Sequence, residues 1–143
     1  MGSLFRLVSL AILIGVARQP QPAVSLRSGD VVFQASKSRR GALIRRATHS
    51  AYSHVGLIEV AADGVFVIEA VEPVSRTPLA AWQARGVDGA MTVMRTTELT
   101  AEQLARVVAV AKASLGVHYD SRYQWTDERL YCSELVSKAF MRG

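Results

Sequence analysis

The chain contains one cysteine, three histidines and few aromatic residues, and each shortage narrows what the protein can be. A lone cysteine, Cys132, excludes an internal disulfide. The histidines His49, His54 and His118 lack the spacing of a zinc site, and no glycine-rich phosphate loop is present, so we expect no metal and no cofactor. No aromatic residues alternate with the basic ones, so we expect no nucleic-acid partner. Half of the 143 residues are hydrophobic, which is typical of one globular domain.

The N-terminal segment lacks an apolar run long enough to span a bilayer, which takes roughly 20 residues. Its apolar run, residues 7–16, follows a single positive charge at Arg6 and precedes the small residue Ala17 and a Pro-rich stretch. This order is typical of an export signal cleaved after Ala17, although an uncleaved anchor or a buried N-terminal helix would also fit. We therefore expect a protein exported to the periplasm or cell envelope, with a signal peptide at 1–17, a linker at 18–27 and a domain at 28–143.

Acidic residues are absent from the segment SKSRRGALIRR, residues 36–46, which supplies much of the net charge of +5. Such a run is usually the solvated face of a helix, but it can also hold an anionic polymer or lipid surface. The sequence leaves both interpretations open for its five basic residues, Lys37, Arg39, Arg40, Arg45 and Arg46.

The hydrophobic pattern predicts strands and helices in mixed order, an α+β fold. β-branched residues on both sides of Asp63 and Gly64 indicate a hairpin. Thr77 and Pro78 have the pattern of a helix N-cap and first helical residue, and Gly86 would end that helix. The expected strands cover residues 29–34, 53–60, 65–71 and 91–96, and the expected helices cover residues 35–48, 79–85, 100–115 and 131 or 132 onward.

The C-terminal part holds the two clearest helices. Thr100 and Gln103 have the pattern of a capping box, and Gly116 sits where a C-terminal cap belongs. The last helix begins near Tyr131 or Cys132 and presents one apolar stripe. The sequence then stops at MRG without a capping signal, which leaves open that the chain is incomplete at its C-terminus.

Cys132 would lie in the first turn of that last helix. The unpaired N–H groups and the positive end of the helix dipole favour a thiolate there over a thiol. In such positions, or beside an imidazolium, the thiol pKa falls from about 8.5 to roughly 3.5 to 7.5. A lone cysteine can equally be a small buried hydrophobic residue, so a catalytic role requires a base nearby.

His54 and Glu69 are predicted to share one face of the hairpin, because side chains alternate along a strand. If AADG forms a four-residue loop, Val60 pairs with Val65 and Glu69 lies diagonally across from His54. A two-residue turn would slide the pairing by two and keep both side chains on one face, further apart. A carboxylate that holds one imidazole nitrogen leaves the other nitrogen free to activate a thiol.

The motifs GDVVFQ, YSHVGLIEV, FVIEAV, GVHYDSRYQW and LYCSELV, in this order, resemble the permuted papain-like amidases, the YiiX-like branch of the NlpC-type cell-wall peptidase superfamily. In that branch the histidine strand precedes the cysteine helix. The resemblance covers about residues 28–140. It implies a circularly permuted papain-like fold, with an antiparallel β-sheet or partial barrel packed against helices and the catalytic cysteine at a helix N-terminus.

The same resemblance implies a catalytic triad with Cys132 as nucleophile, His54 as general base and Glu69 as the residue that orients the imidazole. Tyr119 and Asp120 match a recurring pair before the cysteine and are weaker candidates for substrate or oxyanion binding. The expected function is cleavage of an amide through a thioester, in peptidoglycan peptides if the protein is exported. A lipid amidase or acyltransferase acting on an acyl-amide substrate is the alternative, as is a non-catalytic module that binds anionic polymers through the basic residues.

Overall fold

The computed structural model describes residues 25–143, which form an α+β fold. The expected signal peptide and most of the expected linker lie outside the described residues. The five main strands are β1 (Val31–Gln34), β2 (His54–Ala61), β3 (Gly64–Glu69), β4 (Ser75–Pro78) and β5 (Thr92–Met94). The helices are α1 (Arg39–Thr48), α2 (Leu79–Ala84), α3 (Ala101–Ala113) and α4 (Cys132–Arg142), with a short 3-10 turn at Val87–Gly89 and a two-stranded pair, β6 (His118–Tyr119) and β7 (Arg129–Leu130).

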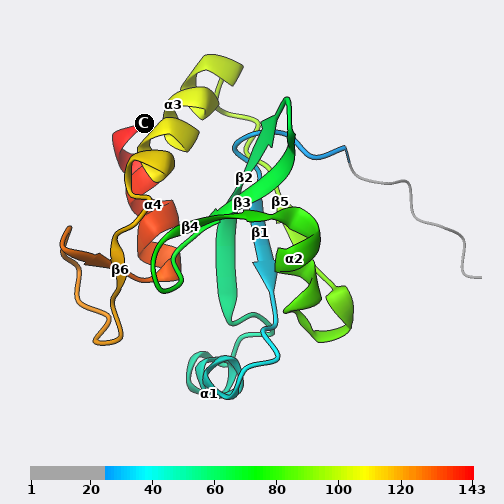
Figure 1. The fold of residues 1–143 in the computed structure, drawn as a ribbon, viewed down its shortest axis with the longest axis vertical. Helices are drawn as coiled ribbons and strands as arrows, with labels where there is room; N and C mark the ends of the chain where they lie inside the picture. The colour runs from blue at the N-terminus through cyan, green and yellow to red at the C-terminus, as the bar shows by residue number, and fades with distance from the viewer. Residues whose placement is uncertain (1–24) are drawn as a thin grey trace, which may run out of the picture.

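The main sheet is antiparallel with the strand order β4-β3-β2-β1-β5. The strand order is linear and the sheet does not close, so of the two arrangements expected the structure has the antiparallel sheet. Figure 1 shows α3 and α4 on one side of the sheet, α2 on the other, and α1 beyond the end of β1 and β2. Within residues 25–143, no helix is both long enough and apolar enough to cross a membrane.

The β2–β3 hairpin fixes the register of the sheet. Val60 pairs with Val65, as the four-residue loop predicted, but Ala61 also pairs with Gly64, so the turn is shortened to two residues. The pairing therefore does not slide, contrary to what the sequence analysis expected of a two-residue turn. Gly64 adopts a φ of 139°, a backbone conformation that glycine accepts without the steric cost a side chain would bring.

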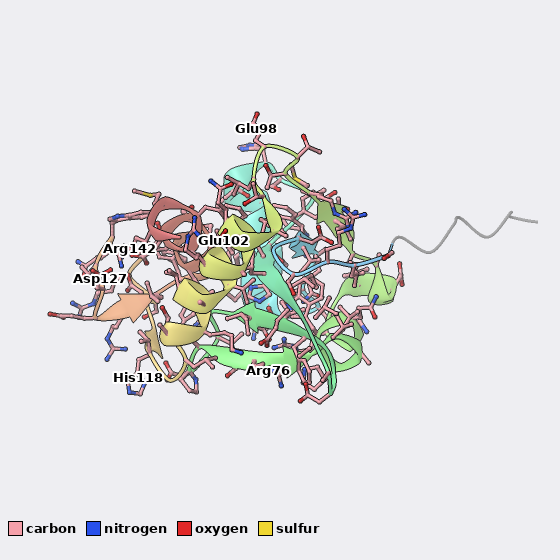
Figure 2. The ribbon with its side chains drawn as sticks, turned by 90° about the horizontal axis from the view of Figure 1, so that it is seen from above. Arg76, Glu98, Glu102, His118, Asp127 and Arg142 are labelled. Carbon is pink, nitrogen blue, oxygen red and sulfur yellow. The ribbon has the colours of Figure 1, made fainter. Side chains whose placement is uncertain are left out.

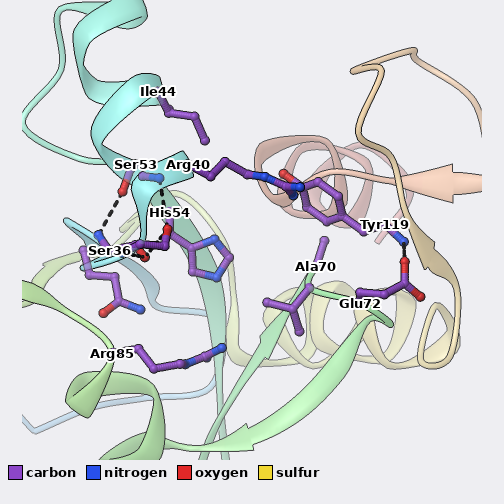
Figure 3. A pocket seen from close by; sticks show the side chains of 13 residues that line it. Ser36, Arg40, Ile44, Ser53, His54, Ala70, Glu72, Arg85 and Tyr119 are labelled. Atoms are coloured by element: carbon purple, nitrogen blue, oxygen red, sulfur yellow. Dashed lines mark hydrogen bonds between the residues drawn. The ribbon is translucent and has the colours of Figure 1, made fainter.

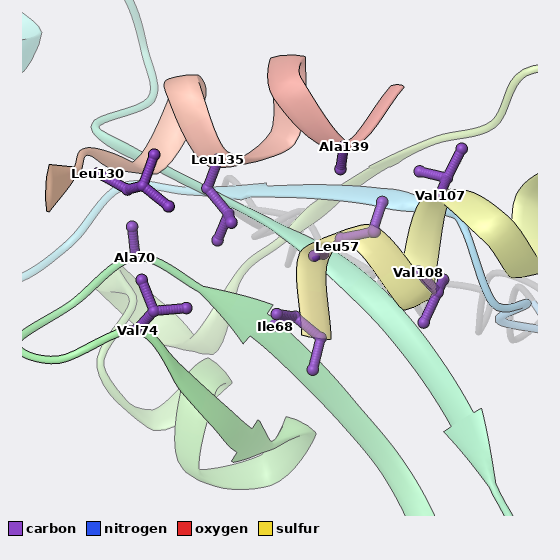
Figure 4. Packing of buried hydrophobic residues seen from close by; sticks show 10 residues of the cluster. Leu57, Ile68, Ala70, Val74, Val107, Val108, Leu130, Leu135 and Ala139 are labelled. Carbon is purple, nitrogen blue, oxygen red and sulfur yellow. The ribbon is translucent and has the colours of Figure 1, made fainter. Parts of the chain in front are cut away.

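The larger hydrophobic core lies between the sheet and the pair α3 and α4 (Figure 4). Leu57 and Ile68 project from neighbouring strands and meet Val107 of α3 and Leu135 of α4. All four side chains are buried, so this packing holds the N-terminus of α4 against the sheet. A smaller cluster on the opposite face joins Val32, Ile58 and Val67 to Trp82 of α2.

The start of α3 follows the predicted capping, and the start of α2 differs from it. Thr100 and Gln103 form the expected capping box at the start of α3, and Ser38 caps α1 by accepting the N–H of Gly41 at 3.0 Å. The predicted cap at Thr77 is wrong: Thr77 belongs to β4, Pro78 precedes α2, and no side chain caps that helix. The hydroxyl of Thr77 instead donates a hydrogen bond within the candidate site.

The loop between β6 and β7 is held to α4 by charged groups. Lys138 is buried and donates to Asp127 at 2.8 Å, and it forms an ion pair with Glu134 at 2.7 Å. Arg142 pairs with the same Asp127 at 2.9 Å, and Figure 2 shows these two residues together at the surface. These contacts connect the loop that precedes Cys132 to the helix that begins with it.

Candidate active site

His54 and Glu69 are in direct contact on the α2 face of the sheet. Gly56 of β2 lies opposite Glu69 by the observed register, so no side chain separates the two. The Nε2 atom of His54 lies 2.5 Å from Oε2 of Glu69. The geometric expectation of the sequence analysis is thus confirmed, and Nδ1 is the ring nitrogen left for another partner.

Glu69 is fully buried and holds two further donors that sequence reasoning missed. Thr77 donates its hydroxyl to Oε1 at 2.6 Å, and the Arg85 guanidinium pairs with the same oxygen. Although burial would raise its pKa, the hydrogen bonds from His54 and Thr77 and the charges of His54 and Arg85 hold the pKa of Glu69 below its ordinary value. The carboxylate is therefore ionised and fixed in orientation.

Cys132 is the first residue of α4 and is half-buried. Burial would raise the pKa of its thiol, but a hydrogen bond and the positive charge of His54 lower it, helped by the backbone N–H groups of Val55 and Ser133. The net result is a thiol pKa below its ordinary value. His54 is the main cause of the lowered pKa, and the N–H of Ser133 at the helix start adds to it.

The imidazole of His54 lies between the thiol and the carboxylate. Its burial would lower the pKa, but hydrogen bonds to Cys132 and Glu69 and their negative charges raise the pKa to about 9. Trp82 lies beside the ring, with 6.3 Å between the ring centroids. A raised histidine pKa beside a lowered cysteine pKa favours the thiolate–imidazolium pair at neutral pH.

The other two histidines lie away from this contact. His49 caps the C-terminal end of α1. His118 places Nδ1 2.6 Å from Oε1 of Glu72, whose other oxygen accepts the N–H of Tyr119 at 3.0 Å. Among the described residues, His54 is thus the only histidine that meets the thiol.

Tyr119 and Asp120 occupy different environments. Burial, a hydrogen bond with Tyr123 and the charge of Cys132 raise the pKa of Tyr119 well above its usual range, so the phenol stays protonated near the thiol. Asp120 is buried, and its carboxylate accepts the backbone N–H groups of Arg122 and Gln124. Asp120 therefore shapes the loop rather than facing the cleft.

A cleft of about 350 Å³ opens beside His54. Figure 3 shows it bounded by α1, the start of β2, the end of β3 and Tyr119. Cys132 does not line this cleft. It is connected to the cleft through His54, which does. Most of the lining side chains are polar or charged, among them Ser36, Ser53, Arg40, Arg85, Glu72 and Tyr119.

The five basic residues of segment 36–46 have different neighbours. Lys37 donates to the carbonyl of Ala84, and Arg45 donates to the carbonyl of Ser36. Arg39 and Arg46 are exposed on α1. Arg40 turns into the cleft and stacks on the ring of Tyr119 at 5.2 Å from its centroid. Lys37, Arg39, Arg40 and Arg46 are exposed, and Arg45 is half-buried.

Comparison with known proteins identifies the family. A family model described as the permuted papain-like amidase enzymes, YaeF/YiiX, C92 family, matches residues 25–143. The chain belongs to this family. The resemblance drawn from the motifs is therefore confirmed, and so is the permuted papain-like α+β fold.

Two members from Escherichia coli resemble the chain over most of its length. The uncharacterized protein YiiX of strain K12 is 40% identical over 142 residues, which cover 96% of this chain and 67% of that protein. The crystal structure of the metalloprotein YiiX from strain O157:H7 is 41% identical, with a TM-score of 0.76 over 80% of this chain. The chain covers 64% of that solved structure, which is less than two thirds of its length.

Proposed function

We propose that this chain is a cysteine amidase in which Cys132 attacks an amide carbonyl, His54 transfers protons and Glu69 orients His54. The observation that carries the proposal is the 2.5 Å contact between the His54 imidazole and the buried Glu69 carboxylate, with the Cys132 thiol close enough to His54 to raise the pKa of the imidazole. Membership in a family of papain-like amidases supports the same kind of chemistry.

The reaction begins with the thiolate–imidazolium pair. The Cys132 sulfur forms a bond to the carbonyl carbon, and the carbonyl π electrons move to the oxygen. When the tetrahedral intermediate collapses, the C–N bond breaks and the imidazolium of His54 gives its proton to the departing amine. A thioester on Cys132 remains. Water, deprotonated by His54, then attacks the thioester and releases a carboxylic acid and the free thiol.

The oxyanion of the intermediate needs hydrogen-bond donors. The first N–H groups of an α-helix have no partner within the helix, and that of Cys132 begins α4. The N–H of Ser133 already turns toward the sulfur. We therefore assign the Cys132 N–H as an oxyanion donor, and the protonated phenol of Tyr119 as a second donor from the loop side.

The substrate that fits best is a peptide amide, such as a stem peptide of peptidoglycan in the cell envelope. The charged and hydroxyl side chains that line the cleft can hydrogen-bond to a peptide backbone, and this supports a peptide substrate. A lipid amidase or acyltransferase would use the same thiol chemistry and release or transfer a fatty acyl group. Incubation with purified peptidoglycan fragments and with acyl amides, followed by mass spectrometry of the products, separates the two.

The YiiX of strain O157:H7 is described as a metalloprotein, which raises the question of a metal site in this chain. Within residues 25–143, no group of three or more His, Cys, Asp or Glu side chains is placed to hold a metal ion. The donor set of the described residues does not fit a metal, and no step of the proposed reaction passes through one.

The exposed C-terminal end of α1 suggests where the enzyme would meet its polymer. Arg46 carries positive charge there, on the helix that borders the cleft. An anionic polymer or lipid surface held there would bring substrate toward His54. Binding to such a surface without hydrolysis would instead favour the non-catalytic alternative.

The test of the proposed function is the rate of alkylation of Cys132 by iodoacetamide as a function of pH. We expect a midpoint well below the free-thiol value of about 8.5 in the wild type and a higher midpoint in His54→Ala. Circular dichroism shows whether the variant is folded. A midpoint near 8.5 in both folded proteins would overturn the triad.

A further inference from the structure

Arg40 is the charge in the cleft without a counter-ion. It lies in the first turn of α1, and its guanidinium rests on the ring of Tyr119 (Figure 3). None of the ion pairs among residues 25–143 includes it. A cation on an aromatic face keeps its N–H groups at the ring edge available for an anion.

The other charged groups that line the cleft are already paired. Arg85 holds the buried carboxylate of Glu69. Glu72 binds His118 at 2.6 Å through one oxygen and the Tyr119 N–H through the other. His54 is positive only as the partner of the Cys132 thiolate and Glu69. Arg40 is therefore the charged residue of the cleft lining that has no ion-pair or hydrogen-bond partner among residues 25–143.

Arg40 lies in the same cleft as His54, so its position indicates which part of the substrate it would contact. In Figure 3 the imidazole is seen between Arg85 and the Arg40 side chain. Tyr119, on which Arg40 stacks, is close enough to the thiol for the charge of Cys132 to influence its phenol. A substrate bound over His54 would thus place a neighbouring group beside Arg40.

We propose that Arg40 binds a carboxylate of the substrate, so that the preferred amide lies close to a free carboxylate group. A guanidinium matches the planar carboxylate with two parallel hydrogen bonds. The hydroxyl of Ser38, which lines the same cleft and accepts the Ser36 hydroxyl at 2.9 Å, provides a further donor on that side. This inference rests on the proposed amidase function and names its substrate class.

The test compares how fast the Cys132 thiol reacts with an anionic and with a neutral alkylating reagent. Second-order rate constants for alkylation of Cys132 by anionic iodoacetate and by neutral iodoacetamide are measured in the wild type, Arg40→Gln and Arg39→Gln. Arg39 is the matched control, because it is exposed on the same turn of α1 and does not line the cleft. We expect the iodoacetate-to-iodoacetamide ratio to fall about three- to tenfold in Arg40→Gln and to stay unchanged in Arg39→Gln.

A second measurement extends the test to a carboxylate that is not reactive. N-acetylalanine should slow iodoacetamide alkylation of the wild type, whereas N-acetylalanine amide should not, and Arg40→Gln should remove the difference. The carboxylate subsite would be overturned if Arg40→Gln and Arg39→Gln had the same iodoacetate-to-iodoacetamide ratio. It would also be overturned if N-acetylalanine and its amide protected the wild-type Cys132 equally. Failure of the amidase proposal has a different signature, an ordinary thiol midpoint near 8.5 in the wild type.

Discussion

Glu69 and His54 meet through Oε2 and Nε2 at 2.5 Å, and the carboxylate in this pair is completely buried. A buried carboxylate is stable only when hydrogen bonds and opposite charges replace the water it has lost. His54, Thr77 and Arg85 together supply them. The orientation of the imidazole thus depends on three elements, β2, β4 and the end of α2.

Replacing Glu69 with Gln should reduce the activity of Cys132. The substitution keeps the size of the side chain but removes the negative charge that stabilises the His54 imidazolium. A charge-assisted hydrogen bond contributes about 1.5–3 kcal/mol, so we expect kcat/KM to fall roughly 10- to 100-fold and the alkylation midpoint to rise. Glu98→Gln, at an exposed glutamate, is the control and should behave as wild type.

Thr77 is a positioning residue, because it acts on the reaction only through Glu69. Thr77→Val keeps the shape and removes the hydroxyl that donates to Oε1. We expect a loss of roughly three- to tenfold in kcat/KM, corresponding to about 1 kcal/mol, and a shifted pH profile. Thr77→Ser should restore both. If valine and serine gave the same profile, the hydroxyl would have no role in orienting Glu69.

The rate of thioester formation should follow a bell-shaped curve against pH. The rising limb reports loss of the proton from Cys132, whose pKa lies below its ordinary value. The falling limb reports loss of the proton from the imidazolium of His54 at a pKa of about 9. Stopped-flow measurement with an activated amide checks this. A falling limb near 6.5, the ordinary histidine pKa, would show that the imidazolium is not stabilised.

Gly56→Ala should destabilise the fold. An added Cβ at Gly56 would overlap Cγ1 of Val67 and approach the carbonyl oxygen of Ile68 at 3.2 Å. Overpacking of this kind costs about 1–3 kcal/mol in the free energy of unfolding, measurable by urea denaturation. In a Val67→Ala background, where the overlapping methyl group is gone, the added cost should be smaller. Additive effects in the double variant would contradict the contact.

The contact of His54 with Glu69 could be predicted because it depends only on local rules. Side chains alternate along β2 and β3, and the turn between them fixes the register. Thr77 and Arg85 could not be predicted in the same way. Thr77 precedes a proline, a pattern that also fits a helix start, and its hydrogen bond to Glu69 exists only because β4 pairs with β3.

β4 was missed for a related reason. It is the edge strand of the sheet and contains Pro78, which is depleted in strands and tolerated at edges. β6 and β7 have two residues each, too few to show an alternating pattern. The role of Asp120 was also invisible in the sequence, because its partners are backbone N–H groups of its own loop.

Cys132 reaches His54 only when α4 packs on the sheet through Leu135 and the core around it. Before that packing the cysteine belongs to a separate, solvated segment and has the reactivity of any free thiol. The reactivity of the Cys132 thiol therefore shows whether α4 is packed on the sheet. Local detachment of this helix would switch off the chemistry while the sheet stays folded, so thiol reactivity and hydrogen exchange in α4 should change together.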